Sequence, residues 1–93
     1  MKLFNRPKKL SKLALYDYKY YLQCFYTPEQ ILSLGITDIQ GMKLKDETIE
    51  LRITLTEPHI LAEDFKELSV FMDKVSRKSV KIVPIHSNLW SFC

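Results

Sequence analysis

The sequence contains little glycine, and this shortage excludes several classes of protein. Gly35 and Gly41 are the only two glycines among 93 residues, so the glycine patterns that hold phosphate groups or a dinucleotide are absent. Neither His59 nor His86 has a nucleophile or an orienting group at a recognisable spacing. We therefore expect a protein that is not an enzyme and that has no metal ion, cofactor or small-molecule substrate.

Long apolar runs are missing as well. No stretch approaches the roughly 20 apolar residues that a membrane-spanning helix needs. Pro7 and Lys12 interrupt the chain after a basic opening that could otherwise resemble a secretion signal. Without such a signal, the two cysteines, Cys24 and Cys93, are most simply interpreted as reduced thiols. These features predict a cytoplasmic protein with no membrane partner.

Positive charge is concentrated at the front of the chain. Residues 1–26 carry six Lys or Arg against one acid, a balance of +5. Residues 27–93 carry eight Lys or Arg against ten acids, a balance of −2, and together they give the formal charge of +3. A basic front end beside a nearly neutral remainder suits a polyanionic partner.

The first half of the chain has clear local signals. Residues 10–25 have helical period, with an apolar face and a basic face. Thr27, followed by proline and then by glutamine at the third position, predicts a short helix over residues 28–34, which Gly35 ends. A strand is predicted over residues 36–45, with a bulge or a weak point at Gly41.

The second half continues with strand and helix patterns. Apolar residues alternate with polar ones over residues 49–55, which predicts a strand paired with the preceding one in an antiparallel hairpin. Residues 62–78 have the apolar spacing of an amphipathic helix. Residues 79–85 form a final predicted strand, and Pro84, which has no backbone donor, indicates that this strand either lies at an edge of the sheet or ends there.

Several segments together carry a family resemblance. They are residues 35–39, residues 56–61, the apolar positions Leu68, Phe71 and Val75, and residues 80–82. These segments, in the order helix, strand, strand, short helix, long helix, strand, resemble a type II KH domain. That family, found in a small-subunit ribosomal protein and in Era-type GTPases, binds nucleic acid. The resemblance implies an α+β fold with a three-stranded sheet packed by helices on one face, preceded here by a basic N-terminal helix.

The chain departs from the family where KH domains hold the nucleic-acid backbone. They use a Gly-x-x-Gly loop between two core helices, but the corresponding residues 62–66 contain no glycine and present Glu63 and Asp64. Carboxylates at a helix start are good caps and poor neighbours for phosphate. Glu57 and His59 also stand where the family has arginine and glycine. We therefore expect a degenerate loop and carry over none of the family's phosphate contacts.

Two functional hypotheses follow, on a chain divided into a basic arm and helix (1–26), a KH-like domain (27–86) and an aromatic tail (87–93). In the first, the chain binds RNA or single-stranded nucleic acid through its front end, with RNA preferred to DNA. The residues predicted for this contact are Lys2, Arg6, Lys8, Lys9, Lys12, Tyr16 and Lys19. In the second, the scaffold is a protein-interaction module, such as a phage or mobile-element adaptor, inhibitor or assembly component. Its predicted contacts are Tyr20, Trp90 and Phe92.

Overall fold

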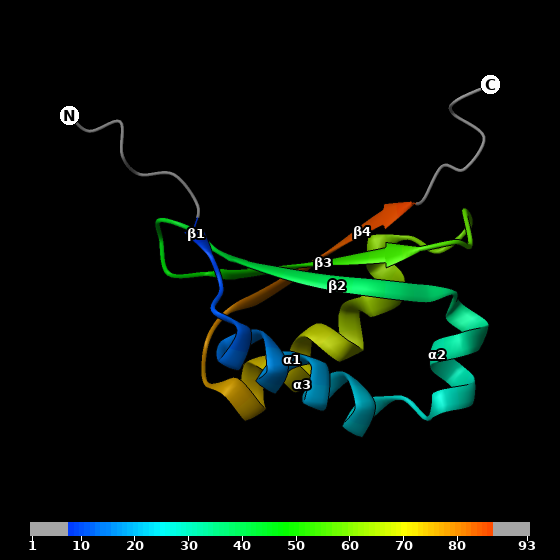
Figure 1. Cartoon of the computed structure of the whole chain (residues 1–93), viewed down its shortest axis with the longest axis horizontal. Helices are drawn as coiled ribbons and strands as arrows, with labels where there is room; N and C mark the ends of the chain where they lie inside the picture. The colour runs from blue at the N-terminus through cyan, green and yellow to red at the C-terminus, as the bar shows by residue number, and fades with distance from the viewer. Residues whose placement is uncertain (1–7, 87–93) are drawn as a thin grey trace.

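The computed structural model describes residues 8–86, which fold into three α-helices, a short 3-10 helix and one mixed sheet. In chain order the elements are β1 (Lys8–Lys9), α1 (Lys12–Phe25), α2 (Pro28–Leu34), β2 (Ile36–Lys43), β3 (Ile49–Leu55), the 3-10 helix η1 (Ala62–Phe65), α3 (Lys66–Ser76) and β4 (Val80–His86). Figure 1 shows α1, α2 and α3 together on one side of the sheet. The predicted α+β class is confirmed.

The sheet has four strands in the order β1-β2-β3-β4, so the prediction of three strands is wrong. The additional strand forms because Lys8 and Lys9 pair antiparallel with Lys43 and Met42. Two exposed lysines have no alternating pattern, which is why the sequence did not predict a strand there. The β2–β3 hairpin is antiparallel as predicted, whereas β4 pairs parallel with β3 after the crossover through α3.

The inward side of β3 lies at the centre of the core. Ile49, Leu51, Ile53 and Leu55 are buried, and the residues between them are only partly covered. This alternation matches the predicted one and leaves the opposite face of the strand to Glu50, Arg52 and Thr54. The helices complete the core with Tyr18, Leu22, Phe65, Leu68 and Met72. The same cluster therefore includes residues of α1, of η1 and of α3.

Capping residues set the ends of the first two helices. Ser11 accepts a hydrogen bond from the Ala14 N–H, so α1 begins at Lys12 and not at the predicted residue 10. Thr27 and Gln30 form the predicted capping box of α2, with distances of 3.1 and 2.8 Å. Gly35 ends α2 with φ 75°, the left-handed conformation that glycine adopts most easily.

Gly41 has a different role from the predicted bulge. The register of β2 against β3 is regular through Gly41, and its one irregularity lies between Ile36 and Asp38. Gly41 is buried, and its carbonyl accepts a 3.0 Å hydrogen bond from the Leu10 N–H. A Cβ at Gly41 would overlap Leu10 Cδ1. The glycine thus permits the chain to cross closely over β2 as it turns into α1.

The predicted helix over residues 62–78 is divided in two and is shorter than expected. Its first four residues form η1, and α3 ends at Ser76 because Arg77 takes a left-handed conformation with φ 59°. Phe65, Leu68 and Met72 are buried as the pattern predicts, while Val75 stays 40% exposed. The final strand lies at the sheet edge as Pro84 predicts, but it continues through that proline to His86.

We expect the substitution Gly35→Ala to lower the free energy of unfolding by about 1–2 kcal/mol. An alanine at φ 75° costs on the order of 1 kcal/mol, and its Cβ would overlap Thr56 Oγ1. Chemical denaturation in the native and Thr56→Ala backgrounds separates the two causes. The steric part of the stability loss should disappear in the Thr56→Ala background, whereas the part due to the left-handed conformation should remain in both backgrounds. Equal stability of Thr56→Ala and the double variant would contradict this assignment.

Candidate nucleic-acid interface

The described lysines of the basic front end lie on two consecutive elements. Lys8 and Lys9 form β1 at one edge of the sheet, Lys12 is the first residue of α1, and Lys19 lies two helical turns further along. All four side chains are exposed. The structure thus brings these predicted residues together on β1 and α1, which meet at the short turn around Leu10 (Figure 1).

None of these four lysines is neutralised by a carboxylate within residues 8–86. The ion pairs of this part of the chain are Lys43–Glu47, Arg52–Glu50 and His59–Glu57, at 2.9, 2.8 and 3.6 Å. Lys43 stands directly opposite Lys8 in the β1–β2 pair, where like charges repel. Its contact with Glu47 reduces that repulsion and leaves Lys8 free to bind an anion.

Two exposed tyrosines stand among these cations on α1. Tyr16 follows Lys12 by four residues and precedes Lys19 by three, a spacing that places all three on one helical face. The Tyr16 ring is 66% exposed and the Tyr20 ring 57% exposed. Contact with the Cys24 side chain raises the pKa of the Tyr20 phenol above its ordinary value. The outer face of α1 therefore combines positive charge with exposed aromatic surface.

The remaining tyrosines of α1 belong to the core, as the helical period predicts. Tyr18 is 5% exposed, and burial raises its pKa. Tyr21 packs against the core and meets Tyr18 edge to face, with ring centroids 5.7 Å apart. One helix thus uses two of its tyrosines for packing and presents two to solvent.

Leu13, a residue for which no functional role was predicted, is 80% exposed on the outer side of α1. Leu13, Tyr16 and Tyr20 follow one another at intervals of three and four residues and form a second apolar stripe opposite the core. That spacing is present in the sequence. It does not stand out there, because the apolar stripe that faces the core has the same helical period.

Four further predicted residues lie outside the described part of the chain: Lys2, Arg6, Trp90 and Phe92.

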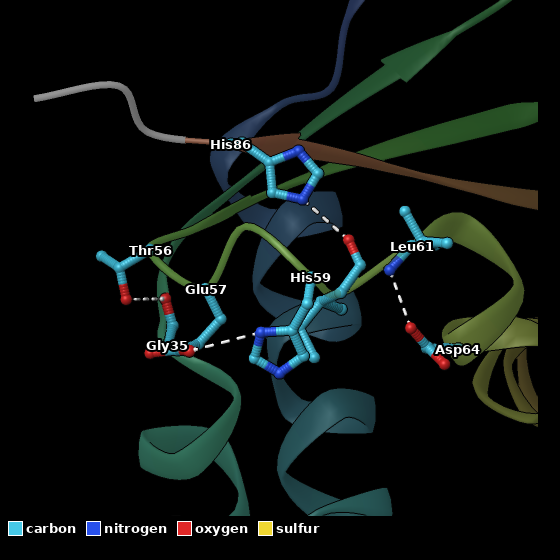
Figure 2. Close-up of polar contacts among 8 residues, drawn as sticks. Gly35, Thr56, Glu57, His59, Leu61, Asp64 and His86 are labelled. Carbon is cyan, nitrogen blue, oxygen red and sulfur yellow. Dashed lines mark hydrogen bonds and ion pairs between the residues drawn. The ribbon is translucent and has the colours of Figure 1, made fainter. Parts of the chain in front are cut away.

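Where KH domains have their glycine loop, η1 passes directly into α3 without a loop. The Leu61 N–H donates to Asp64 Oδ2 at 2.7 Å, which Figure 2 shows beside the start of η1. Glu63 is exposed and is not part of that bond. The interpretation of Asp64 as a helix cap is confirmed, and the backbone at this position has no free glycine amides with which to bind a phosphate.

The segment before η1 is held by contacts to two distant parts of the chain (Figure 2). The Thr56 N–H donates to the Gly35 carbonyl at 2.9 Å. His86 Nε2 lies 2.7 Å from the Ile60 carbonyl oxygen, which can only accept, so this nitrogen is the donor. His86 therefore ties the end of β4 to the chain that leads into η1. This contact gives the histidine a structural role.

The described residues offer no metal site of the usual kind. Between residues 8 and 86, no three histidine, cysteine or acidic side chains come together in a way that could hold an ion. In the same range, no helix has both the length and the apolar character needed to cross a membrane.

No protein-family model, no curated protein and no solved structure matches this chain. The functional assignment therefore depends on the geometry of the described residues.

We expect Asp64→Ala to lower the free energy of unfolding by about 1 kcal/mol, because it leaves the Leu61 N–H without its acceptor. Glu63→Ala is the matched control, since it removes a neighbouring carboxylate that makes no such bond. Urea denaturation of both variants measures the difference. If the two substitutions had the same effect, the cap would not be the function of Asp64.

Proposed function

We propose that the chain binds single-stranded nucleic acid, RNA in preference to DNA, through the exposed side of β1 and α1. The observation that carries this proposal is the group of four exposed lysines, Lys8, Lys9, Lys12 and Lys19, without carboxylate partners in the described chain. They lie on two consecutive elements, and Lys12 and Lys19 share a helical face with the exposed ring of Tyr16. The order α2, β2, β3, η1, α3, β4 also agrees with the KH-like order seen in the sequence and favours RNA.

The proposed contact is electrostatic. Lysines that neutralise phosphates release condensed counterions. For single strands, each phosphate contact therefore adds about −0.7 to the slope of log affinity against log salt concentration. The four described lysines together with Lys2 and Arg6 would therefore give a slope of about −4. Lysine ammonium groups on flexible stems do not fix a base edge, so this part of the contact is independent of base sequence.

Tyr16 supplies the preference for single strands. An exposed ring can stack only on a base that is not already stacked inside a duplex. Tyr16 lies between Lys12 and Lys19 on the same helical face, so a base on its ring would have phosphates within reach of lysines on both sides. Base stacking of this kind contributes about 1–3 kcal/mol per base.

The triple variant Lys8→Ala/Lys9→Ala/Lys12→Ala should lose at least about tenfold in affinity for single-stranded RNA and should reduce the salt slope by about 2. Fluorescence anisotropy of labelled RNA, DNA and duplex between 20 and about 150 mM salt measures both quantities. The double variant Lys66→Ala/Lys81→Ala is the control, because it also removes exposed lysines but on α3 and β4. Unchanged RNA affinity of the triple variant would overturn the proposal.

Tyr16→Ala should weaken binding to single-stranded RNA about 5- to 100-fold, which corresponds to the loss of one stacked base. Tyr16→Phe should retain the affinity, because stacking requires the ring and not the hydroxyl. The thermal midpoint should change little in either variant, since the ring is exposed. Equal losses for alanine and phenylalanine would argue against stacking.

A protein-interaction module is the second candidate, and the apolar stripe of Leu13, Tyr16 and Tyr20 favours it. Exposed aromatic surface of this kind is typical of protein interfaces. The same salt titration discriminates between the candidates. An absence of nucleic-acid binding even at low salt, or an affinity that does not fall as salt is added, would favour the protein partner.

A further inference from the structure

A groove lies along the free edge of β4, on the side of the molecule formed by η1, α3 and β4. It has a volume of about 400 Å³. Its wall on the helical side includes Phe65 and Val70, and its other wall is the strand at Val80 and Ile82. Val70 is 49% exposed, so its side chain is accessible to a partner in the groove. The floor of the groove is therefore apolar.

The edge of β4 offers backbone hydrogen-bonding groups to this groove. Ser79 directs its carbonyl toward β3, where the Ile49 N–H donates to it at 2.8 Å. The backbone groups of Val80 point away from β3: the N–H donates to Asp73 Oδ1 at 2.7 Å, and the carbonyl accepts from Ser69 Oγ at 2.6 Å. Because this direction alternates along a strand, Ile82 also directs its N–H and its carbonyl outward. No side chain between residues 8 and 86 forms a hydrogen bond with the N–H or the carbonyl of Ile82.

The open stretch of this edge is short. On one side of Ile82, the polar groups of Val80 are already bonded to α3. On the other side, Pro84 has no N–H to donate. A partner strand could therefore form a full pair of hydrogen bonds only at Ile82, which limits the match to a segment of two or three residues.

The rim of the groove is basic. Lys66 and Lys81 line it and are exposed, and neither belongs to an ion pair of residues 8–86. Glu63 is the one acidic side chain of the lining. An apolar floor, an open backbone pair and two lysines on the rim together match an extended chain with one apolar side chain between acidic neighbours.

We propose that this groove binds a short, extended, acidic segment of another polypeptide, which adds a strand to β4 at Ile82 and places an apolar side chain against Val70. Main-chain hydrogen bonds to a strand edge are a recurrent mode of peptide recognition, and the neighbouring pocket selects the side chain. This contact is separate from the proposed nucleic-acid interface, because β1 and β4 are the opposite edges of the sheet.

The probes are fluorescein-labelled heptapeptides of sequence Glu-Thr-Glu-X-Glu-Thr-Glu, with valine, leucine or phenylalanine at X and glycine as the control. We expect at least one apolar member to bind the full chain at least tenfold more tightly than the glycine peptide. Methylation of the three central backbone nitrogens should abolish binding, because it removes the donors of the added strand. In the amide NMR spectrum, the Ile82 resonance should move on addition of the peptide.

The charge-reversal variant Lys66→Glu/Lys81→Glu should lose at least tenfold in peptide affinity. Its matched control is Lys45→Glu/Lys78→Glu, which changes the charge equally at exposed lysines outside the groove, and which should retain the affinity. Val70→Glu should weaken binding, whereas Val75→Glu on the same helix should not. Unchanged thermal midpoints of these exposed-site variants show that the domain is intact.

Three results would overturn the proposal: no binding of any apolar peptide at millimolar concentration, binding that survives backbone methylation, or binding that is indifferent to the Lys66/Lys81 reversal. A single-stranded RNA that moves the Ile82 amide when the peptides do not would assign the groove to nucleic acid instead. The Lys8/Lys9/Lys12 alanine variant separates the two proposals, because it should lose RNA and keep the peptide.

Discussion

The pairing of β3 on both sides is the constraint on which the rest of the structure depends. Its seven residues pair with β4 in a continuous parallel register, and the same strand pairs with β2 in the hairpin. Leu51, Ile53 and Leu55 are fully buried beneath the helices, and burial of such a side chain contributes roughly 1.5–3 kcal/mol. β3 has neighbours along both edges, whereas β1 pairs only with Met42 and Lys43 of β2, so the outer edge of β2 has no strand partner over most of its length. The two proposed contacts lie at the opposite edges of this sheet and on the outer face of α1.

The two sheet edges are protected from uncontrolled pairing in different ways. On one edge, β1 is only two residues long and both are lysine, and short, charged edge strands disfavour pairing with another sheet. On the other edge, Asp73 and Ser69 bond the polar groups of Val80, and Pro84 removes a donor. The first solution leaves positive charge at the surface, and the second leaves one open backbone pair beside a groove. The proposed nucleic-acid contact uses the first edge, and the proposed peptide contact uses the second.

Local signals predicted those parts of the fold that depend on neighbouring residues. The capping box of α2, the left-handed Gly35 and the alternation of β3 all belong to this class. The lysine strand β1 could not be predicted, because only its pairing with Lys43 and Met42 makes it a strand. The charge of the front end was visible in the sequence, but the lack of carboxylate partners for Lys8, Lys9, Lys12 and Lys19 within residues 8–86 depends on contacts between distant residues. The groove at β4 was equally hidden, since it joins residues 62–70 with residues 80–82.

The fold uses both glycines of the chain, and this restricts how it can recognise phosphate. Gly35 is needed for the left-handed end of α2, and Gly41 for the close crossing of Leu10 over β2. The segment 62–66 has no glycine, and its helix start is capped by the Asp64 carboxylate, so backbone amides cannot close around a phosphate there. In the proposed nucleic-acid contact, the phosphates therefore meet lysine side chains, which are flexible point charges without a fixed fork geometry. Such contacts would give an affinity that depends strongly on salt and little on base sequence, so the proposed preference for single strands rests on the exposed ring of Tyr16.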